Sequence, residues 1–269
     1  MSNQAVDLIG KWVVNDYFTP NIKAEVVLDT LLTPYIGQIL KKQCDIDAAF
    51  LTKEMSLEEY TEEDQQSDDR GAKIDYLLVG EYVYLVELKT TTGGINAPQA
   101  ERYLKNCCDL NGKPKTFGDV FGDKLLRIVN KMHSEIPSSP QGLKDAFQAF
   151  VGGDGKNAER ARQYLKKRSL AVTHKYLYTI GQILDNYPDL DALWGKRLRL
   201  LYITPTGKLP HGKLLSASHF YLYPKKTNGK EPGSISLRDA VKTLDCTDEL
   251  AGLLQSIVNE IYSTEDNHV

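Results

Sequence analysis

The sequence predicts an α/β fold in which a central mixed β-sheet is flanked by helices. Three observations support this prediction. An amphipathic helical pattern opens the chain, strand patterns follow it, and a further strand pattern comes after a long helical region. The chain has 269 residues, of which 41% are hydrophobic, so it can form a sizeable core. We therefore expect a single domain over 1–269 with a mostly helical insertion at about 117–193.

The first half of the chain gives patterns for two helices and three strands, in the order helix, strands, helix. Apolar residues at helical or alternating spacing define these segments, and Gly80-Glu81 forms the turn between the second and third strands. Pro34 is expected to kink or split the first helix, and Pro98 opens the second. The expected bounds are 22–42 and 98–109 for the helices, and 49–57, 73–79 and 82–91 for the strands.

The second half of the chain is mostly helical before it returns to strand character. Prolines and glycines separate the helical segments. A strand is predicted at 197–204, ending at Pro205, and a further strand at 219–223. The expected helices lie at 123–135, 141–150, 158–167, 175–186, 237–244 and 248–262.

Charge and cysteine content restrict the function classes. The net charge of −3 and the pI of about 6.0 argue against a protein that simply coats nucleic acid, because such proteins are normally basic. They allow an enzyme whose positive charge is concentrated near one cleft. The four cysteines lack C-x-x-C spacing, so no zinc or iron–sulfur site is expected. Without a bilayer-spanning apolar segment or a secretory signal, the protein is expected in the cytoplasm with no membrane partner.

Two carboxylates and a lysine fall on the two strands around the Gly80 turn. Glu87 and Lys89 share one face of their strand, because strand side chains alternate between faces. Asp75 lies on the preceding strand, and the short turn makes the two strands antiparallel neighbours. We therefore expect a register that brings Asp75 beside Glu87. Buried charges need partners or a metal, and carboxylate oxygens suit Mg²⁺ or Mn²⁺.

This set of residues suits metal-dependent hydrolysis of a phosphodiester. The metal would polarise the scissile phosphate and lower the pKa of an attacking water. Lys89 would orient that water or offset charge in the transition state. The alternative is an interstrand salt bridge of Lys89 with Asp75 or Glu87, in a protein with a structural or regulatory role. The buried hairpin and the upstream aspartate favour the catalytic interpretation.

The pattern resembles a known nuclease family. Asp75, followed on the next strand by Glu87 and Lys89 with one residue between them, is similar to the D…(D/E)-x-K signature of the PD-(D/E)XK superfamily. The resemblance covers about residues 20–105 and, more faintly, the later strand. The proline of the family name is absent because Ile74 precedes Asp75, at a position that varies in the family. The resemblance implies a restriction-endonuclease-like core and an Mg²⁺- or Mn²⁺-dependent deoxyribonuclease.

The resemblance also assigns roles to individual residues. Asp75 and Glu87 would bind the metal together with the backbone carbonyl of Leu88, and Lys89 would position the water. Glu25, on the first helix, would be an additional metal-site residue, as in many relatives. Without the resemblance, Glu25 is equally well interpreted as a carboxylate that faces solvent.

Gln99 and Tyr103 match a second motif of the same family. They are four residues apart and share one helical face, which resembles the Q-x-x-x-Y motif of the RecB and lambda-exonuclease branch. As in that branch, the motif follows the E-x-K strand on a helix. The resemblance implies that these side chains contact substrate phosphate or hold the active site. Taken alone, they would be an ordinary exposed glutamine and a packing tyrosine.

A basic segment between 156 and 175 is the candidate surface for the substrate backbone. It contains seven basic residues and one acidic residue, so it could follow a line of phosphates. A solvated helix face explains the same pattern equally well. The candidate contact residues are Arg160, Arg162, Lys166, Lys167 and Arg168.

The predicted function is therefore a metal-dependent nuclease whose partner is nucleic acid, with DNA expected. The alternative is a catalytically inactive module of the same fold that binds nucleic acid or protein. The sequence leaves open endonuclease or exonuclease action, the choice between DNA and RNA, and specificity. Ring or dimer assemblies occur in the family, so self-association or a partner protein is compatible with the resemblance, although no interface can be recognised.

Overall fold

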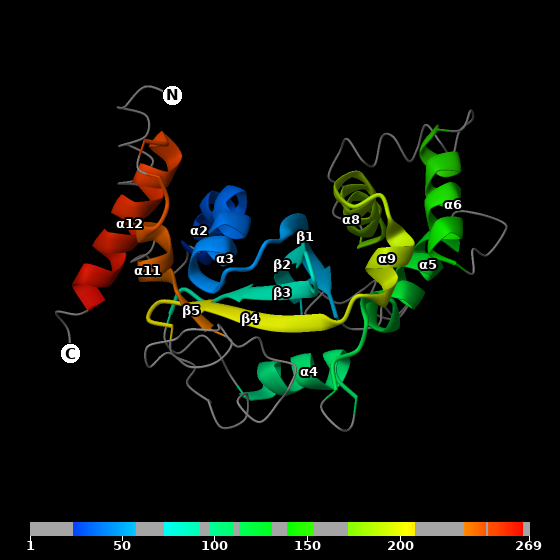
Figure 1. Ribbon diagram of the computed structural model, residues 1–269, viewed down its shortest axis with the longest axis horizontal. Helices are drawn as coiled ribbons and strands as arrows, with labels where there is room; N and C mark the ends of the chain where they lie inside the picture. Colours follow the sequence, from blue (N-terminus) through cyan, green and yellow to red (C-terminus); the bar gives the residue numbers. More distant parts are fainter. Residues whose placement is uncertain are drawn as a thin grey trace. The chain divides into compact units, whose positions relative to one another are not determined.

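The strands predicted on either side of the Gly80 turn lie within a mixed five-stranded sheet (Figure 1). The computed structural model describes residues 24–57, 73–91, 97–109, 113–130, 139–152, 172–207, 234–245 and 247–265. The strand order is β1-β2-β3-β4-β5, with β1 and β2 antiparallel and β4 and β5 parallel. The strand bounds are Ala49–Ser56, Lys73–Val79, Val83–Leu88, Leu198–Thr204 and Ser234–Ser236. The prediction of an α/β fold with a mixed sheet flanked by helices is confirmed.

The central strand β3 is buried along its whole length. All six of its residues are buried, as its near-continuous apolar sequence indicates. The strand ends at Leu88, three residues before the predicted end. Its backbone nevertheless stays paired, because Val83 N–H donates to Arg197 O at 3.0 Å and Lys89 N–H donates to Ile203 O at 2.8 Å. From the first bond to the second, both partners advance by six residues in the same chain direction, so β3 and β4 run parallel.

Contacts along the chain divide it into two compact units that are each built from separate segments. Unit 1 comprises Met1–Ala48, Val86–Ala100 and Leu200–Val269. Unit 2 comprises Ala49–Leu85 and Glu101–Arg199. The strands β3 and β4 and the helix after β3 contribute residues to both units, so the units do not correspond to two halves of the sequence.

The predicted first helix lies in unit 1, and Pro34 divides it. A 3₁₀ turn at Thr33–Tyr35 separates α2 from α3, and Pro34 occupies the start of that turn. Thr33 Oγ1 donates to Asp29 O at 2.8 Å, which satisfies a carbonyl at the end of α2. Two C-terminal helices, α11 and α12, pack against each other (Figure 1). The bounds are Ala24–Leu32 for α2, Ile36–Cys44 for α3, Leu237–Lys242 for α11 and Glu249–Glu265 for α12.

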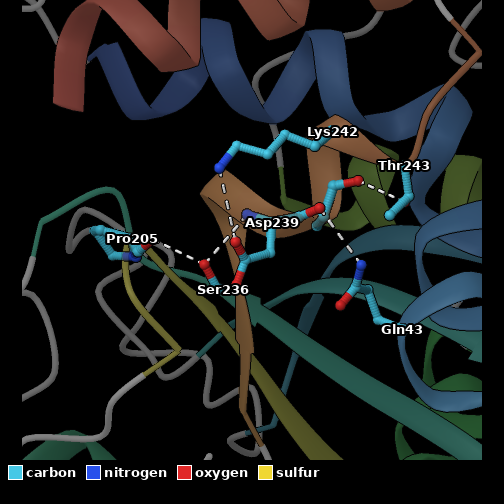
Figure 2. Close-up of polar contacts among 7 residues, drawn as sticks. Gln43, Pro205, Ser236, Asp239, Lys242 and Thr243 are labelled. Atoms are coloured by element: carbon cyan, nitrogen blue, oxygen red, sulfur yellow. Dashed lines mark hydrogen bonds and ion pairs between the residues drawn. The ribbon is translucent and has the colours of Figure 1, made fainter. Parts of the chain in front are cut away.

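Polar contacts hold the junction between β5 and α11 (Figure 2). Ser236 Oγ accepts from Asp239 N at 3.2 Å, which caps α11, and donates to Pro205 O at 3.3 Å. Gln43 Nε2 donates to Asp239 O at 3.4 Å and so ties α3 to α11. The bonds of Ser236 fix the end of β5, a strand of three residues that the sequence pattern did not predict.

Unit 2 contains the helices of the predicted insertion. Helix α8 packs on the edge strand β1, where Thr52 Oγ1 donates to Gln182 Oε1 at 2.8 Å and Asn186 Nδ2 donates to Leu51 O at 3.0 Å. The second bond occupies a carbonyl of the edge strand, which makes that edge less available for pairing. A π-helical turn at Gly118–Gly122 precedes α5. The bounds are Asp123–Asn130 for α5, Pro140–Gly152 for α6, Val172–Asn186 for α8 and Leu190–Gly195 for α9.

The described helices lie close to the predicted ones, with differences at the ends. Helix α5 is described only to Asn130, and the short helix α9 was not predicted. The predicted helix at 158–167 and the predicted strand at 219–223 lie outside the described residues. Of the helices in the described ranges, none combines the length and the apolar character needed to cross a membrane.

Candidate active site

Glu87 is the buried carboxylate of the E-x-K segment. Its side chain is 2% exposed, and the side chain of Lys89 is 12% exposed. Lys89 Nζ lies 2.7 Å from Glu87 Oε1. The pair forms because residues two apart on extended backbone point to the same side. A carboxylate inside an apolar sheet is costly without compensation, and the lysine supplies the opposite charge.

Gln99 contacts the same carboxylate oxygen from the helix that follows β3. This helix, α4, spans Ala97–Cys107. Gln99 Nε2 donates to Glu87 Oε1 at 3.1 Å. Because an ionised carboxylate can only accept hydrogen bonds, the contact orients the glutamine amide with its NH₂ group toward Glu87. Two donors on one oxygen fix the direction in which the carboxylate points, and charge-assisted bonds of this kind are the stronger ones.

The backbone on either side of Lys89 is held at two points. Lys89 N–H donates to Ile203 O on β4 at 2.8 Å. The carbonyl of the next residue, Thr90, accepts a bond from Tyr262 Oη at 2.7 Å, and both of these residues are buried. Sequence reasoning missed Tyr262 because its spacing on α12 is that of a packing residue, and its partner is 172 positions away. No local pattern could have identified this contact.

Tyr103, the second residue of the Q-x-x-x-Y match, is fully buried on α4. Its hydroxyl donates to the backbone carbonyl of Lys73 at 2.9 Å. Lys73 begins β2, and Asp75 is the third residue of that strand, where it is partly buried. Tyr103 therefore binds the start of the strand that carries Asp75, and all three residues belong to unit 2. Glu87, Lys89 and Gln99 form their contacts within unit 1.

The remaining predicted residues are described only in part. Glu25 lies on α2, but its side chain is outside the described residues, as are Arg160, Arg162, Lys166, Lys167 and Arg168. Leu88 is buried at the end of β3. Among the described side chains, no group of three or more His, Cys, Asp or Glu is arranged to hold a metal ion. The Glu87 carboxylate and the backbone carbonyl of Leu88 are hard oxygen donors of the kind that Mg²⁺ prefers.

Cys107, at the end of α4, is a fully buried thiol. Burial raises the pKa of this thiol, and the neighbouring Cys108 raises it further, against the opposing effect of Lys124 and Lys115. Because the thiolate is the reactive and metal-binding form, a thiol that stays protonated at neutral pH acts as an apolar packing group.

Comparisons with protein-family models, with curated proteins and with solved structures give no match for this chain. The interpretation of the site therefore depends on the residues themselves and on their contacts.

Proposed function

We propose that this protein is a metal-dependent nuclease of the PD-(D/E)XK type that hydrolyses phosphodiester bonds, with DNA as its substrate. The observation that carries the proposal is the buried Glu87–Lys89 pair at 2.7 Å, with Gln99 bonded to the same carboxylate oxygen at 3.1 Å. A strand, the segment just after it and the next helix supply these three groups, in the chain order of the sequence motif.

Each of the three groups has a distinct part in the proposed chemistry. Glu87 supplies a carboxylate for the cation, and Gln99 keeps that carboxylate in one orientation. Lys89 orients an attacking water and offsets negative charge in the transition state. A bound Mg²⁺ or Mn²⁺ would supply Lewis acidity and lower the pKa of the water.

The cation fits the donor chemistry of these residues. Glu87 and the Leu88 carbonyl offer oxygen donors beside a lysine that compensates charge. Asp75 is proposed as the second carboxylate and Glu25 as a further ligand, both on the sequence pattern. The basic segment around Arg160 is proposed to contact the nucleic-acid backbone on the same ground.

The test is cleavage of linear and circular DNA, single- and double-stranded, and of RNA, with Mg²⁺, Mn²⁺ or EDTA. Lys89→Ala is compared with Lys105→Ala, which removes an exposed lysine of α4. We expect metal-dependent cleavage that falls about 100-fold or more in Lys89→Ala, in line with the loss of one group that stabilises the transition state, and is unchanged in Lys105→Ala. Cleavage of linear DNA without cleavage of circular DNA would identify an exonuclease.

Three outcomes would count against the proposal. Cleavage that resists EDTA would exclude the metal requirement. Cleavage that survives in a folded Lys89→Ala protein would remove Lys89 from the chemistry. A folded wild-type protein that cleaves no DNA or RNA substrate with either metal would favour the alternative, an inactive module of the same fold. Binding of labelled DNA or RNA without cleavage would then identify the ligand class of that module.

A further inference from the structure

We infer that Tyr262 is a positioning residue for Lys89, and this inference rests on the proposed nuclease function. The tyrosine lies on α12, near the C-terminal end of the described chain. Its hydroxyl donates to the carbonyl of Thr90 at 2.7 Å, immediately after the lysine. Thr90 and Tyr262 are both buried, so solvent does not readily replace this bond.

The bond acts where the strand no longer fixes the backbone. Strand β3 ends at Leu88, and the regular ladder therefore stops one residue before Lys89. Two bonds continue the restraint: Lys89 N–H to Ile203 O at 2.8 Å, and Tyr262 Oη to Thr90 O. The first fixes the peptide before the Lys89 Cα, and the second fixes the carbonyl of the next residue, Thr90. The backbone that carries Lys89 is thereby restrained on both sides.

A lysine needs such restraint because its side chain has a flexible four-carbon stem and a compact point charge. Its Nζ must meet Glu87 Oε1 at 2.7 Å, and the direction of its Cα–Cβ bond decides whether it can. A displacement of about 1 Å in a catalytic group can lower a rate by about 100-fold. Helix α12 is suited to this task because it is long, at 17 residues, and packs against α11 and α2.

The experiment compares Tyr262→Phe with Tyr35→Phe. Each variant deletes one phenol hydroxyl and keeps the ring, so packing is preserved. The Tyr35 hydroxyl bonds Asp248 just before α12, so this control also removes a bond made to the α12 region, away from Lys89. Steady-state cleavage and hydrogen exchange at the backbone amide of Lys89 are measured for both variants, together with thermal unfolding.

We expect Tyr262→Phe to lower kcat about tenfold while KM stays within about twofold, because substrate binding is kept and the lysine is misplaced. The Lys89 amide should exchange about tenfold faster than in Tyr35→Phe, and Tyr35→Phe should keep the wild-type kcat. A kcat in Tyr262→Phe equal to that of wild type would overturn the inference. An equal fall of kcat in both variants would also overturn the inference, because it would indicate a general loss of stability.

The exchange measurement keeps this inference separate from the proposed function. If the wild-type protein cleaves nothing, the nuclease proposal fails. Faster exchange at Lys89 in Tyr262→Phe alone would still support the positioning of this lysine by Tyr262. Exchange at the wild-type rate would overturn it, whatever the activity.

Discussion

At the scale of single residues, the Glu87 carboxylate is the feature that most needs a physical explanation. A buried salt bridge is weak evidence for stability, because desolvation of two charges offsets much of their attraction. Apolar residues of similar size would fit the interior of β3 at lower cost. The chain instead keeps a carboxylate, a lysine and an amide in contact. The proposed catalytic role would account for this cost.

Gln99→Leu tests how far the amide stabilises this arrangement. The substitution keeps the size and helix propensity of the residue but removes the donor to Glu87 Oε1. Hydrogen bonds to charged groups contribute about 1.5–3 kcal/mol, so we expect the free energy of unfolding to fall by about that amount. Urea unfolding measures it. Gln148→Leu, at an exposed position of α6, is the control, and an equal loss in both variants would contradict the assignment.

The Tyr35–Asp248 hydrogen bond makes stability depend on pH in two directions. Burial, and after it the bond to Asp248, raises the pKa of Tyr35 to about 12. The unfolded tyrosine ionises near pH 10, so the folded protein holds the proton more tightly between these values. Stability from this residue is therefore complete below about pH 10 and is lost as the pH rises toward 12. The same bond, as the first cause, lowers the pKa of Asp248, whose contribution is present above about pH 4 and is lost on acidification.

Tyr35→Phe tests this pH dependence. We expect the difference in unfolding free energy between wild type and Tyr35→Phe to be constant from about pH 5 to 9. It should narrow above about pH 10 and below about pH 4, because only the wild type carries the Tyr35 hydroxyl and its bond to Asp248. Chemical unfolding across this range is the measurement. A difference that stays constant from about pH 2 to 12 would show that the tyrosine and the aspartate do not interact in solution.

At the scale of elements, the π-helical turn before α5 depends on glycine for close packing. A Cβ on Gly118 would overlap Trp194 Cδ1 and lie 2.8 Å from its Nε1. The indole cannot move away freely, because its ring packs edge-on against Phe117 with centroids 5.6 Å apart. Overpacking of this kind costs about 1–3 kcal/mol, and we expect Gly118→Ala to lose that much stability.

Gly152→Ala is the matched control for Gly118→Ala. It lies at the end of α6, and nothing lies within 4 Å of the position that the added methyl group would take. Because alanine restricts the unfolded chain, this substitution should be neutral or stabilising by up to about 1 kcal/mol. Thermal unfolding of the two variants separates the effects. Equal melting temperatures for the two variants would mean that the Trp194 side chain moves aside without loss of stability.

The sequence predicted the elements whose pattern is local and missed those fixed by distant contacts. Strand β2 has the predicted bounds, and the proline split the first helix as expected. Strand β5 has three residues, too few for an alternating pattern, and depends on pairing with β4 and on the Ser236 cap. The predicted end of β3 was three residues too late: beyond Leu88, Lys89 keeps a backbone bond to β4 but the regular strand has ended.

In the candidate site, too, the sequence predicted the local features and missed the contact between distant segments. The placement of Glu87 and Lys89 on one face follows from the alternation of side chains along one strand. The choice of Gln99 as a site residue follows from the helix motif. The contact of Tyr262 with Thr90 joins residues 172 positions apart, and no periodicity encodes it. The approach of Asp75 to Glu87 stays a prediction, because it depends on the register between two strands rather than on the pattern within one.

At the scale of the whole molecule, the net charge of −3 places a condition on any nucleic-acid partner. Phosphates would be repelled by the average field, so attraction has to come from local positive charge or from a bound cation. A divalent cation at Glu87 would therefore serve binding as well as chemistry. The proposed metal requirement can therefore be tested by cation binding to the intact protein, without any substrate.

Metal binding should raise the melting temperature of the wild-type protein. A ligand at about ten times its Kd stabilises the folded state by about 1.4 kcal/mol, which corresponds to about 3–5 °C for a chain of this size. We expect Mn²⁺ to give such a shift and EDTA to reverse it. Glu87→Gln should abolish the shift because it removes the carboxylate, whereas Glu81→Gln, at the exposed turn before β3, should keep it. An equal shift in both variants would place the cation elsewhere, and no shift in the wild type would leave Glu87 and Lys89 as an ion pair without a metal.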